Sequence, residues 1–298
     1  MKRRAFLAAG FLSLAASGCG FRPFGGFRPL TFIQIADPQL GFLAGGDGNN
    51  FTVEAGILER VVAVINRMRP APVFIAVCGD LTNIPGHPAQ IAGYKRLMGM
   101  VNPDIPVYNL PGNHDFHPDL TAESMEAYRK TFGPDRYSFE VRGWRFIALN
   151  STLLQLPGKR PEELAAQTEW LRKILAEASR SRGIVVFMHH PFSESDISGG
   201  PDTRSIGRTY LDLFARRRVA SVFSGHTHRT VREKSYQGVR LINTNGLCRS
   251  FDNNPGLRVV RVAADRIEHE FVSVRPDTGM ELTKPVTKTE RWIFRDVA

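Results

Sequence analysis

The sequence predicts a single α/β domain. From residue 30 onward, apolar runs typical of buried strands alternate with stretches of helical periodicity, and the chain has no internal repeats. About 245 residues of this kind are enough for one sizeable hydrophobic core. Five of the strand runs end directly in polar residues that can bind metal ions, which connects the predicted fold to a predicted site.

The expected elements follow one another along the chain. Strands that precede a polar motif are predicted at residues 30–36, 73–77, 107–110, 184–188 and 219–224. Helices are predicted near 53–69, 89–101, 121–132, 167–182 and 204–218. Three later strands are expected near 239–244, 257–263 and 266–274, and residues 276–298 follow them as a C-terminal extension.

A short polar motif follows each of the five strands. The motifs are Asp37-Pro38-Gln39, Gly79-Asp80, Gly112-Asn113-His114-Asp115, His189-His190-Pro191 and Gly225-His226-Thr227-His228. Because the carboxyl ends of parallel strands share one edge of a sheet, we expect the motifs to meet there. Five of the eight histidines lie in them. Taken singly, each motif has a simpler interpretation as a turn or a polar strand end; their common placement favours one site.

Seven side chains of these motifs are candidate metal ligands. They are Asp37, Gln39, Asp80, Asn113, His189, His226 and His228. Carboxylate, amide and imidazole donors suit first-row divalent ions, and none of the motifs contains a thiolate. Seven donors are too many for one tetrahedral ion and fit two ions with open positions for water. Two ions about 3.5–4 Å apart are typical of phosphoester hydrolysis.

In this order, the motifs resemble those of the calcineurin-like metallophosphoesterase superfamily. Residues 35–42, 222–226 and 256–260 further resemble a branch with an Asp-Pro-Gln first motif, that of the eukaryotic calcineurin-like phosphoesterase domain-containing phosphatases. The resemblance implies a four-layer α/β/β/α sandwich of two mixed sheets, with the three late strands in the second sheet. It also implies a dimetal-dependent phosphoester hydrolase that uses a metal-bound hydroxide.

The resemblance also divides the ligands between the two ions. It gives Asp37, Gln39, Asp80 and His228 to the first ion and Asp80, Asn113, His189 and His226 to the second, so that Asp80 bridges them. Position 39 is Gln where most of the superfamily has His. A neutral oxygen donor favours harder ions. Two divalent ions are therefore expected, Mn or Fe first, with Mg, Zn or Co as alternatives.

Further residues are candidates for contact with the substrate. The resemblance implies that His114 stabilises the phosphoryl charge or protonates the leaving oxygen, and that Asp115 orients its imidazole. His190 stands beside the ligand His189 and is placed behind the ligands or at the rim of the site. Three arginines are weaker candidates for phosphate binding, since each is more simply a solvated surface residue: Arg204, Arg208 and Arg249.

The N-terminus resembles an export signal. Lys2-Arg3-Arg4 precedes an apolar run over residues 5–16, which is too short to span a bilayer. Arg3-Arg4 resembles a twin-arginine signal, and Cys19 the lipidated cysteine of bacterial lipoproteins. An amphipathic first helix is the simpler alternative. The expected divisions are a signal peptide at 1–18, a linker at 19–29, the phosphoesterase domain at 30–275 and the extension at 276–298.

The composition is consistent with an exported enzyme for anionic substrates. The chain has 39 basic and 29 acidic residues, a net charge of +10 that falls to +7 without Lys2, Arg3 and Arg4. Such a surface attracts anionic substrates and anionic membranes. The basic residues are scattered, so no specific nucleic-acid partner is predicted. Three cysteines are too few for a disulfide framework, and whether Cys78 and Cys248 pair stays open.

The expected function is hydrolysis of a small-molecule or protein phosphomonoester by a lipoprotein anchored to a membrane, in the periplasm or at the cell surface. Two alternatives stay open. The same site suits a phosphodiesterase or nucleotide hydrolase. A surface lipoprotein that binds metal without turnover is a different class of protein, and the pair His114 and Asp115 argues against it.

Overall fold

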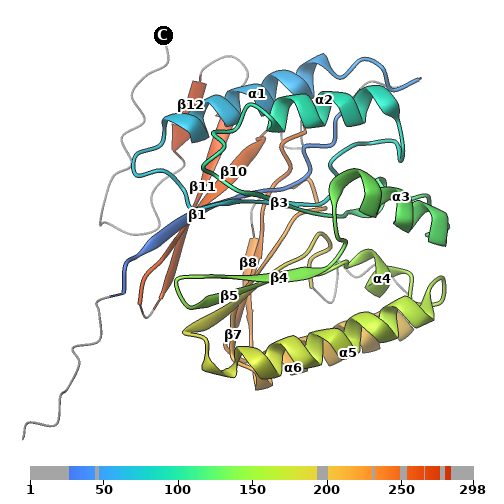
Figure 1. Ribbon diagram of the computed structural model, residues 1–298, viewed down its shortest axis with the longest axis vertical. Coiled ribbons are helices and arrows are strands. Elements are labelled where there is room, and N and C mark those ends of the chain that lie inside the picture. Colours follow the sequence, from blue (N-terminus) through green and yellow to red (C-terminus); the bar gives the residue numbers. More distant parts are fainter. Residues whose placement is uncertain are drawn as a thin grey trace, which may run out of the picture.

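Two β-sheets packed face to face, with helices on both outer faces, form the four layers of the structure (Figure 1). The computed structural model describes residues 27–43, 47–192, 201–229, 232–248, 254–264, 266–275 and 279–282. The α/β/β/α sandwich of two mixed sheets predicted from the sequence is therefore confirmed. Among the described residues, no helix has both the length and the apolar character required to cross a bilayer.

The first sheet has the strand order β12-β11-β10-β1-β2-β3. Its strands are β1 (Leu30–Ile35), β2 (Ile75–Cys78), β3 (Val107–Leu110), β10 (Gly256–Val262), β11 (Ile267–Arg275) and β12 (Gly279–Leu282). Strands β1, β2 and β3 are parallel, whereas β10, β11 and β12 pair antiparallel. The parallel pairs are joined by the crossover helices α1 (Thr52–Arg67) and α2 (Pro88–Met98), as parallel strands require.

The second sheet has the order β4-β5-β6-β7-β9-β8. Its strands are β4 (Tyr137–Val141), β5 (Trp144–Ala148), β6 (Gly183–Phe187), β7 (Val219–Ser224), β8 (Arg232–Tyr236) and β9 (Val239–Asn243). Strands β5, β6, β7 and β9 are parallel, and β4 and β8 are antiparallel edge strands. Helices α5 (Pro161–Glu177) and α6 (Pro201–Arg216) cover its outer face (Figure 1).

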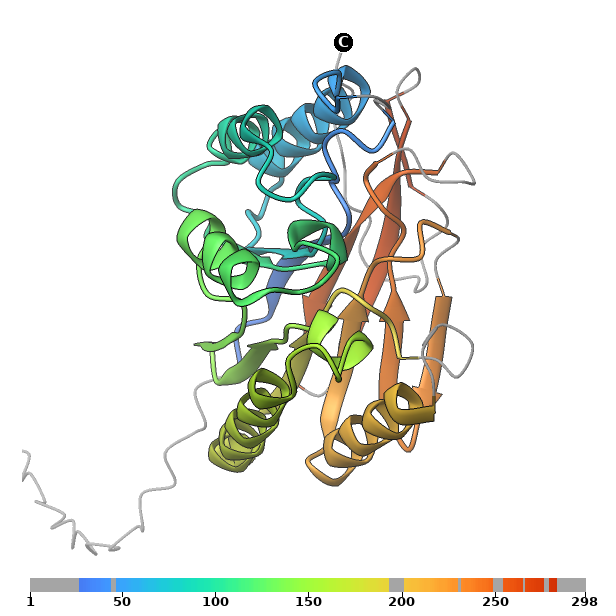
Figure 2. The same cartoon turned by 90° about the vertical axis from the view of Figure 1, so that its right-hand side faces the viewer.

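Shorter elements connect the layers near the carboxyl ends of the parallel strands (Figure 2). They are the 3-10 turn η1 (Asn113–Asp115) and the helices α3 (Ala122–Phe132) and α4 (Thr152–Gln155). A second 3-10 turn, η2 (Ala178–Arg180), instead follows α5 and precedes β6. Helix α3 begins at an N-cap, since the side chain of Thr121 accepts a hydrogen bond from the Ser124 amide.

Phenylalanine rings fill the space between the sheets. Phe32 of β1 stacks on Phe74 at a ring-centroid distance of 4.8 Å and meets Phe187 of β6 edge-on at 5.5 Å. It also meets Phe223 of β7 edge-on at 5.7 Å. These rings are fully or almost fully buried. Offset and edge-on ring contacts stabilise a defined packing, and they hold the end of β1 beside the ends of β6 and β7.

Two sequence-based expectations need correction. Strands β10 and β11 do not belong to the second sheet: β10 pairs with β1, and β11 with β10, so only β9 of the three late strands lies there. The helix predicted at 167–182 begins earlier, at Pro161. Proline at the first turn and the acidic Glu162 and Glu163 after it are helix-start signals.

Candidate metal centre

The polar motifs meet where the carboxyl ends of the parallel strands of the two sheets come together. Asp37, Asp80 and Asn113 follow β1, β2 and β3 of the first sheet. His189 follows β6, and His226 and His228 follow β7, in the second sheet. The structure thus brings six of the seven sequence-predicted ligands into one cluster, and Gln39 lies at its side.

The first group of candidate ligands is Asp37, Asp80 and His228, whose donor atoms lie within 4.8 Å of one another. His228 Nε2 is 3.2 Å from Asp37 Oδ1. Gln39 is buried beside this group and donates a hydrogen bond from Nε2 to Asn83 Oδ1 at 3.1 Å. Its other amide atom, Oε1, faces the Cys248 thiol at 3.6 Å.

The second group surrounds His189. Its Nε2 lies 3.1 Å from Asn113 Oδ1 and 3.2 Å from both Asp80 Oδ2 and His226 Nδ1. His189 Nδ1 donates to the carbonyl oxygen of Cys78 at 2.9 Å. Metal-binding histidines characteristically donate their second ring N–H to such a carbonyl, which leaves the first nitrogen free for the ion. Asp80 belongs to both groups and is thus placed as a bridge would be.

Charge interactions explain the protonation of the metal-free cluster. Burial alone would lower the pKa of His189, but the carboxylates of Asp80 and Asp37 raise it to about 9. Burial would raise the pKa of Asp80, and the charge of His189 instead lowers it below its usual range. Burial and the neighbouring His189 lower the pKa of His226 to about 4. A proton on His189 therefore occupies the place where a divalent cation would balance the two carboxylates.

The backbone is strained at the candidate ligands. Five non-glycine residues of the cluster adopt positive φ angles: Asp37 (48°), Gln39 (35°), Asp80 (51°), His226 (73°) and His228 (46°). Such conformations cost about 1–3 kcal/mol each and are typical of functional sites. Two glycines allow the motifs to approach one another: a Cβ at Gly79 would meet the His189 ring, and one at Gly112 the Asp80 carboxylate.

His114 lies beside the carboxylate of Asp80, but Asp115 does not orient its imidazole. His114 Nδ1 donates to the carbonyl oxygen of Asn83 at 2.9 Å. The carboxylate of Asp115 instead accepts the backbone N–H groups of Leu81, Thr82 and Gly112. The role predicted for Asp115 is therefore wrong. The residue fixes the two ligand-bearing turns after β2 and β3, and burial and the charge of Asp80 raise its pKa to about 8.

The remaining substrate candidates have different positions. His190 is buried, not at the rim, and its ring centroid lies 4.4 Å from that of His226. Arg208 is exposed on α6 with its guanidinium over the ring of Tyr236. Arg204 lies on the first turn of α6. Arg249 and Cys19 fall outside the described residues.

Two residues of the site were not singled out by the sequence. Ser151, at the start of α4, contacts the turn of His189 and His190, and no motif includes it. Cys248 is a free, buried cysteine, as is Cys78, so the two do not pair. The Cys248 thiol lies 3.6 Å from Gln39 Oε1 and 3.4 Å from His228 Nδ1. Cys248 follows β9, which pairs with β7, and this position after a strand is the sequence feature that could have indicated its closeness to the site.

The side chains present fit two divalent cations. Asp80 lies with Asp37 and His228 in the first group, and its Oδ2 lies 3.2 Å from His189 Nε2 of the second. A carboxylate and an imidazole nitrogen thus face each other in each group. Oxygen and imidazole donors of this kind suit first-row divalent ions. Such a pair of ions at the carboxyl edge of a mixed α/β sandwich defines a metal-dependent phosphoesterase.

The chain belongs to the calcineurin-like phosphoesterase family, whose model matches residues 30–230. It is 33% identical over 264 residues to serine/threonine-protein phosphatase CPPED1 of Rattus norvegicus, covering 83% of this chain and 84% of that protein. It is 25% identical over 280 residues to the 3',5'-cyclic adenosine monophosphate phosphodiesterase CpdA of Escherichia coli (strain K12), covering 87% of this chain and 97% of that protein.

The fold is similar to that of a purple acid phosphatase from yellow lupin (Lupinus luteus), with a TM-score of 0.63 at 13% identity over 86% of this chain and 53% of that chain. The family, its CPPED1-like branch and the phosphoester hydrolase activity predicted from the motifs are therefore confirmed. The family and the two ligand groups also support divalent metal ions as cofactors.

Proposed function

We propose that this chain is a phosphomonoesterase that works with two divalent ions. The supporting observation is the position of Asp80, which lies in both ligand groups and accepts the backbone N–H of His114. When bound, two ions supply Lewis acidity and a nucleophilic hydroxide for attack on phosphorus. The chain's own residues then hold the phosphoryl group and move the proton.

His114 is the candidate for proton transfer. Because its Nδ1 donates to the Asn83 carbonyl, Nε2 is the atom that exchanges a proton with the substrate. A protonated Nε2 stabilises the charge that develops on the phosphoryl group and protonates the leaving oxygen. His114 is half-buried, so it is accessible to a substrate at the cluster.

Mn or Fe is the proposed metal. The first ligand group contains two carboxylates and only one imidazole, with the amide side chain of Gln39 beside it, which favours harder ions over Zn. Metal analysis of the purified protein, followed by removal and replacement of the ions, tests this. Full activity restored by Zn but not by Mn or Fe would contradict it.

The preference for monoesters rests on the greater identity to CPPED1, which is named a phosphatase. A phosphodiesterase is the second candidate, because the similarity to CpdA extends over nearly the whole of that protein. Hydrolysis of mono- and bis-p-nitrophenyl phosphate, measured side by side with Mn, separates the two. A higher kcat/KM for the diester would replace the proposed function with the second candidate.

We also propose that the enzyme is exported and anchored to a membrane through Cys19. The support is the N-terminal sequence, in which Arg3 and Arg4 precede a short apolar run that ends at Cys19. A Cys19→Ser variant should leave the membrane fraction or accumulate as uncleaved precursor. A processed variant that stays membrane-bound would contradict the proposal.

A further inference from the structure

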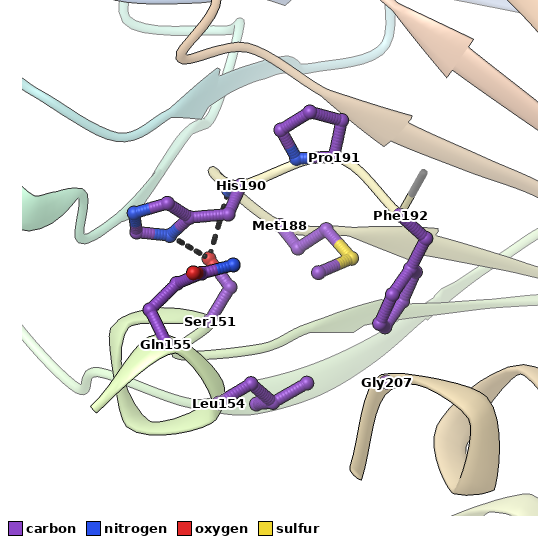
Figure 3. Close-up of a pocket in the computed structure, with 8 residues that line it drawn as sticks. All are labelled: Ser151, Leu154, Gln155, Met188, His190, Pro191, Phe192 and Gly207. Carbon is purple, nitrogen blue, oxygen red and sulfur yellow. Dashed lines mark hydrogen bonds between the residues drawn. The ribbon is translucent and has the colours of Figure 1, made fainter. Parts of the chain in front are cut away.

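Ser151 and His190 form a buried, hydrogen-bonded pair (Figure 3) next to the candidate metal ligand His189. The Ser151 hydroxyl oxygen lies 2.9 Å from the backbone nitrogen of His190 and 3.2 Å from that of His189. It also lies 2.9 Å from the ring nitrogen Nδ1 of His190. Three nitrogen atoms therefore surround one oxygen of a fully buried serine.

These contacts determine which nitrogen of His190 bears the proton. A serine oxygen has two lone pairs and one proton. The two backbone N–H groups can only donate, so they use both lone pairs. The remaining bond must then run from the Ser151 hydroxyl to His190 Nδ1, which accepts. The neutral imidazole consequently has its proton on Nε2.

The adjacent histidines thus have opposite tautomers. His189 donates from Nδ1 to the Cys78 carbonyl, so Nε2 is the nitrogen that would bind an ion once its proton is lost. His190 accepts at Nδ1 and has an N–H at Nε2, so it is unsuited to bind an ion through Nε2. Through this hydrogen bond, Ser151 gives His190 a different protonated nitrogen from that of the neighbouring metal ligand His189.

The ring of His190 lies against the ligand cluster, with its centroid 4.8 Å from that of His189 and 4.4 Å from that of His226. One ring nitrogen of each of His189, His190 and His226 lies within 4.8 Å of the others. In Figure 3, the second ring nitrogen of His190 points away from Ser151. The cavity behind the pair is only about 10 Å³, enough for at most one water. A substrate bound at the cluster would therefore meet the side of the His190 ring that is opposite Ser151.

We propose that His190 is a neutral hydrogen-bond donor to a phosphoryl oxygen and that Ser151 is the positioning residue that sets its tautomer. This inference rests on the proposed phosphoesterase function for the identity of the ligand. The ring donates from Nε2 to an anionic oxygen without a net charge of its own, so it holds the phosphoryl group without competing with the metal ions for their ligands.

The tautomer is tested by NMR of the Mg- or Zn-loaded full chain with ¹⁵N-labelled histidine. We expect a protonated Nε2 and a bare Nδ1 for His190, and loss of this preference in Ser151→Ala. Thr168→Val is the matched control, because it removes the partly buried hydroxyl that contacts Tyr210 on α6 and should leave the His190 signals unchanged. A protonated Nδ1 in the wild-type protein would overturn the proposal.

Phosphate binding is tested with orthophosphate as the probe in His190→Phe, which keeps Ser151 and the ring shape but has no donor. We expect unchanged metal content and binding weakened by about tenfold or more, as for a lost hydrogen bond to a charged group. Loss of one metal ion would identify His190 as a ligand and overturn the proposal, and so would unchanged phosphate affinity with both ions present.

These measurements do not depend on turnover. If no phosphoester were hydrolysed, the proposed function would fail while the tautomer and the phosphate affinity could still be determined. Conversely, if the protein is an active phosphatase and the His190→Phe variant binds orthophosphate normally, the proposed function stands. Only the proposed role of Ser151 and His190 then fails.

Discussion

The carboxylate of Asp80 accepts the backbone N–H of His114 through Oδ1 at a distance of 2.9 Å. Its other oxygen, Oδ2, faces His189 at 3.2 Å. One oxygen is thus held by the turn that positions the proposed proton donor, while the other is directed into the second ligand group. A change at Asp80 should therefore affect metal binding and the position of His114 together.

Asp80→Asn should lower metal content and phosphoesterase activity in parallel. The substitution keeps the size of the side chain and removes the negative charge that two cations would share. Metal analysis of the purified variant and the rate with Mn measure the two effects. Asp104→Asn, at an exposed aspartate, is the control and should change neither. Full metal occupancy in Asp80→Asn would exclude the bridge.

His114→Ala should retain both metal ions and lower turnover by about 10²–10⁴-fold, the range typical of a lost general acid. If His114 protonates the leaving oxygen, the loss should be smallest for esters with good leaving groups, which need little protonation. A series of aryl phosphates of different leaving-group pKa measures this. An equal loss across the series would instead indicate charge stabilisation, and wild-type rates on every ester would remove His114 from the mechanism.

The convergence of the motifs could be predicted because it depends on local features. Each candidate ligand directly follows an apolar strand, and parallel strands place their carboxyl ends at one edge. The sheet to which β10 and β11 belong could not be predicted in this way. Their alternating pattern indicates strands, but the partner of residues 256–262 is β1, more than 200 residues earlier in the chain.

The hydrogen bonds that Asp115 and Ser151 make around the ligands could not be predicted from the sequence either. Asp115 follows His114 directly, yet the turn directs its carboxylate to the amides of Leu81 and Gly112, and the carbonyl of Asn83 takes the place beside the imidazole. Ser151 reaches His190 across 39 positions of sequence. Such contacts depend on side-chain direction in turns and on packing between elements, which no short motif encodes.

Metal binding should release protons near pH 7. In the metal-free cluster, burial opposes a proton on His189, but Asp80 and Asp37 raise its pKa to about 9, so the imidazole is protonated and must lose its proton to bind an ion. Apparent affinity should therefore rise by about tenfold per pH unit between pH 7 and 9 for each displaced proton. Calorimetry in buffers of different ionisation enthalpy counts the protons.

The control for this measurement is His117→Ala, because the side chain of His117 is exposed and is not one of the candidate metal ligands. The variant should release the same number of protons as the wild-type protein. Metal binding without proton release at pH 7, or an affinity that does not change up to pH 9, would contradict the protonation described for His189.

An ion-pair cluster between α3 and α5 should make stability depend on pH. Arg129 contacts Asp135 at 3.0 Å and Glu163 at 3.2 Å, and Arg136 contacts Glu163 at 3.0 Å. Burial would raise the pKa of Glu163, but hydrogen bonds from Arg136 and Arg129 lower it below its usual value. A carboxylate whose pKa is lowered by folding stabilises the folded state at pH values above its unfolded-state pKa, near 4.3 for Glu. This stabilisation is lost as the pH falls through the folded-state pKa.

Glu163→Gln should therefore lower the free energy of unfolding at pH 7 by about 0.5–1 kcal/mol, because water still screens this partly exposed group. The difference from the wild-type protein should shrink as the pH falls from the unfolded-state pKa near 4.3 through the lower folded-state pKa, below which Glu163 is protonated in both states. Denaturant unfolding at several pH values measures it. Glu126→Gln, which removes the exposed pair with Lys130 on α3, is the control and should have no measurable effect. A Glu163→Gln difference that stays constant down to pH 3 would show that the lost stability comes from packing and not from charge.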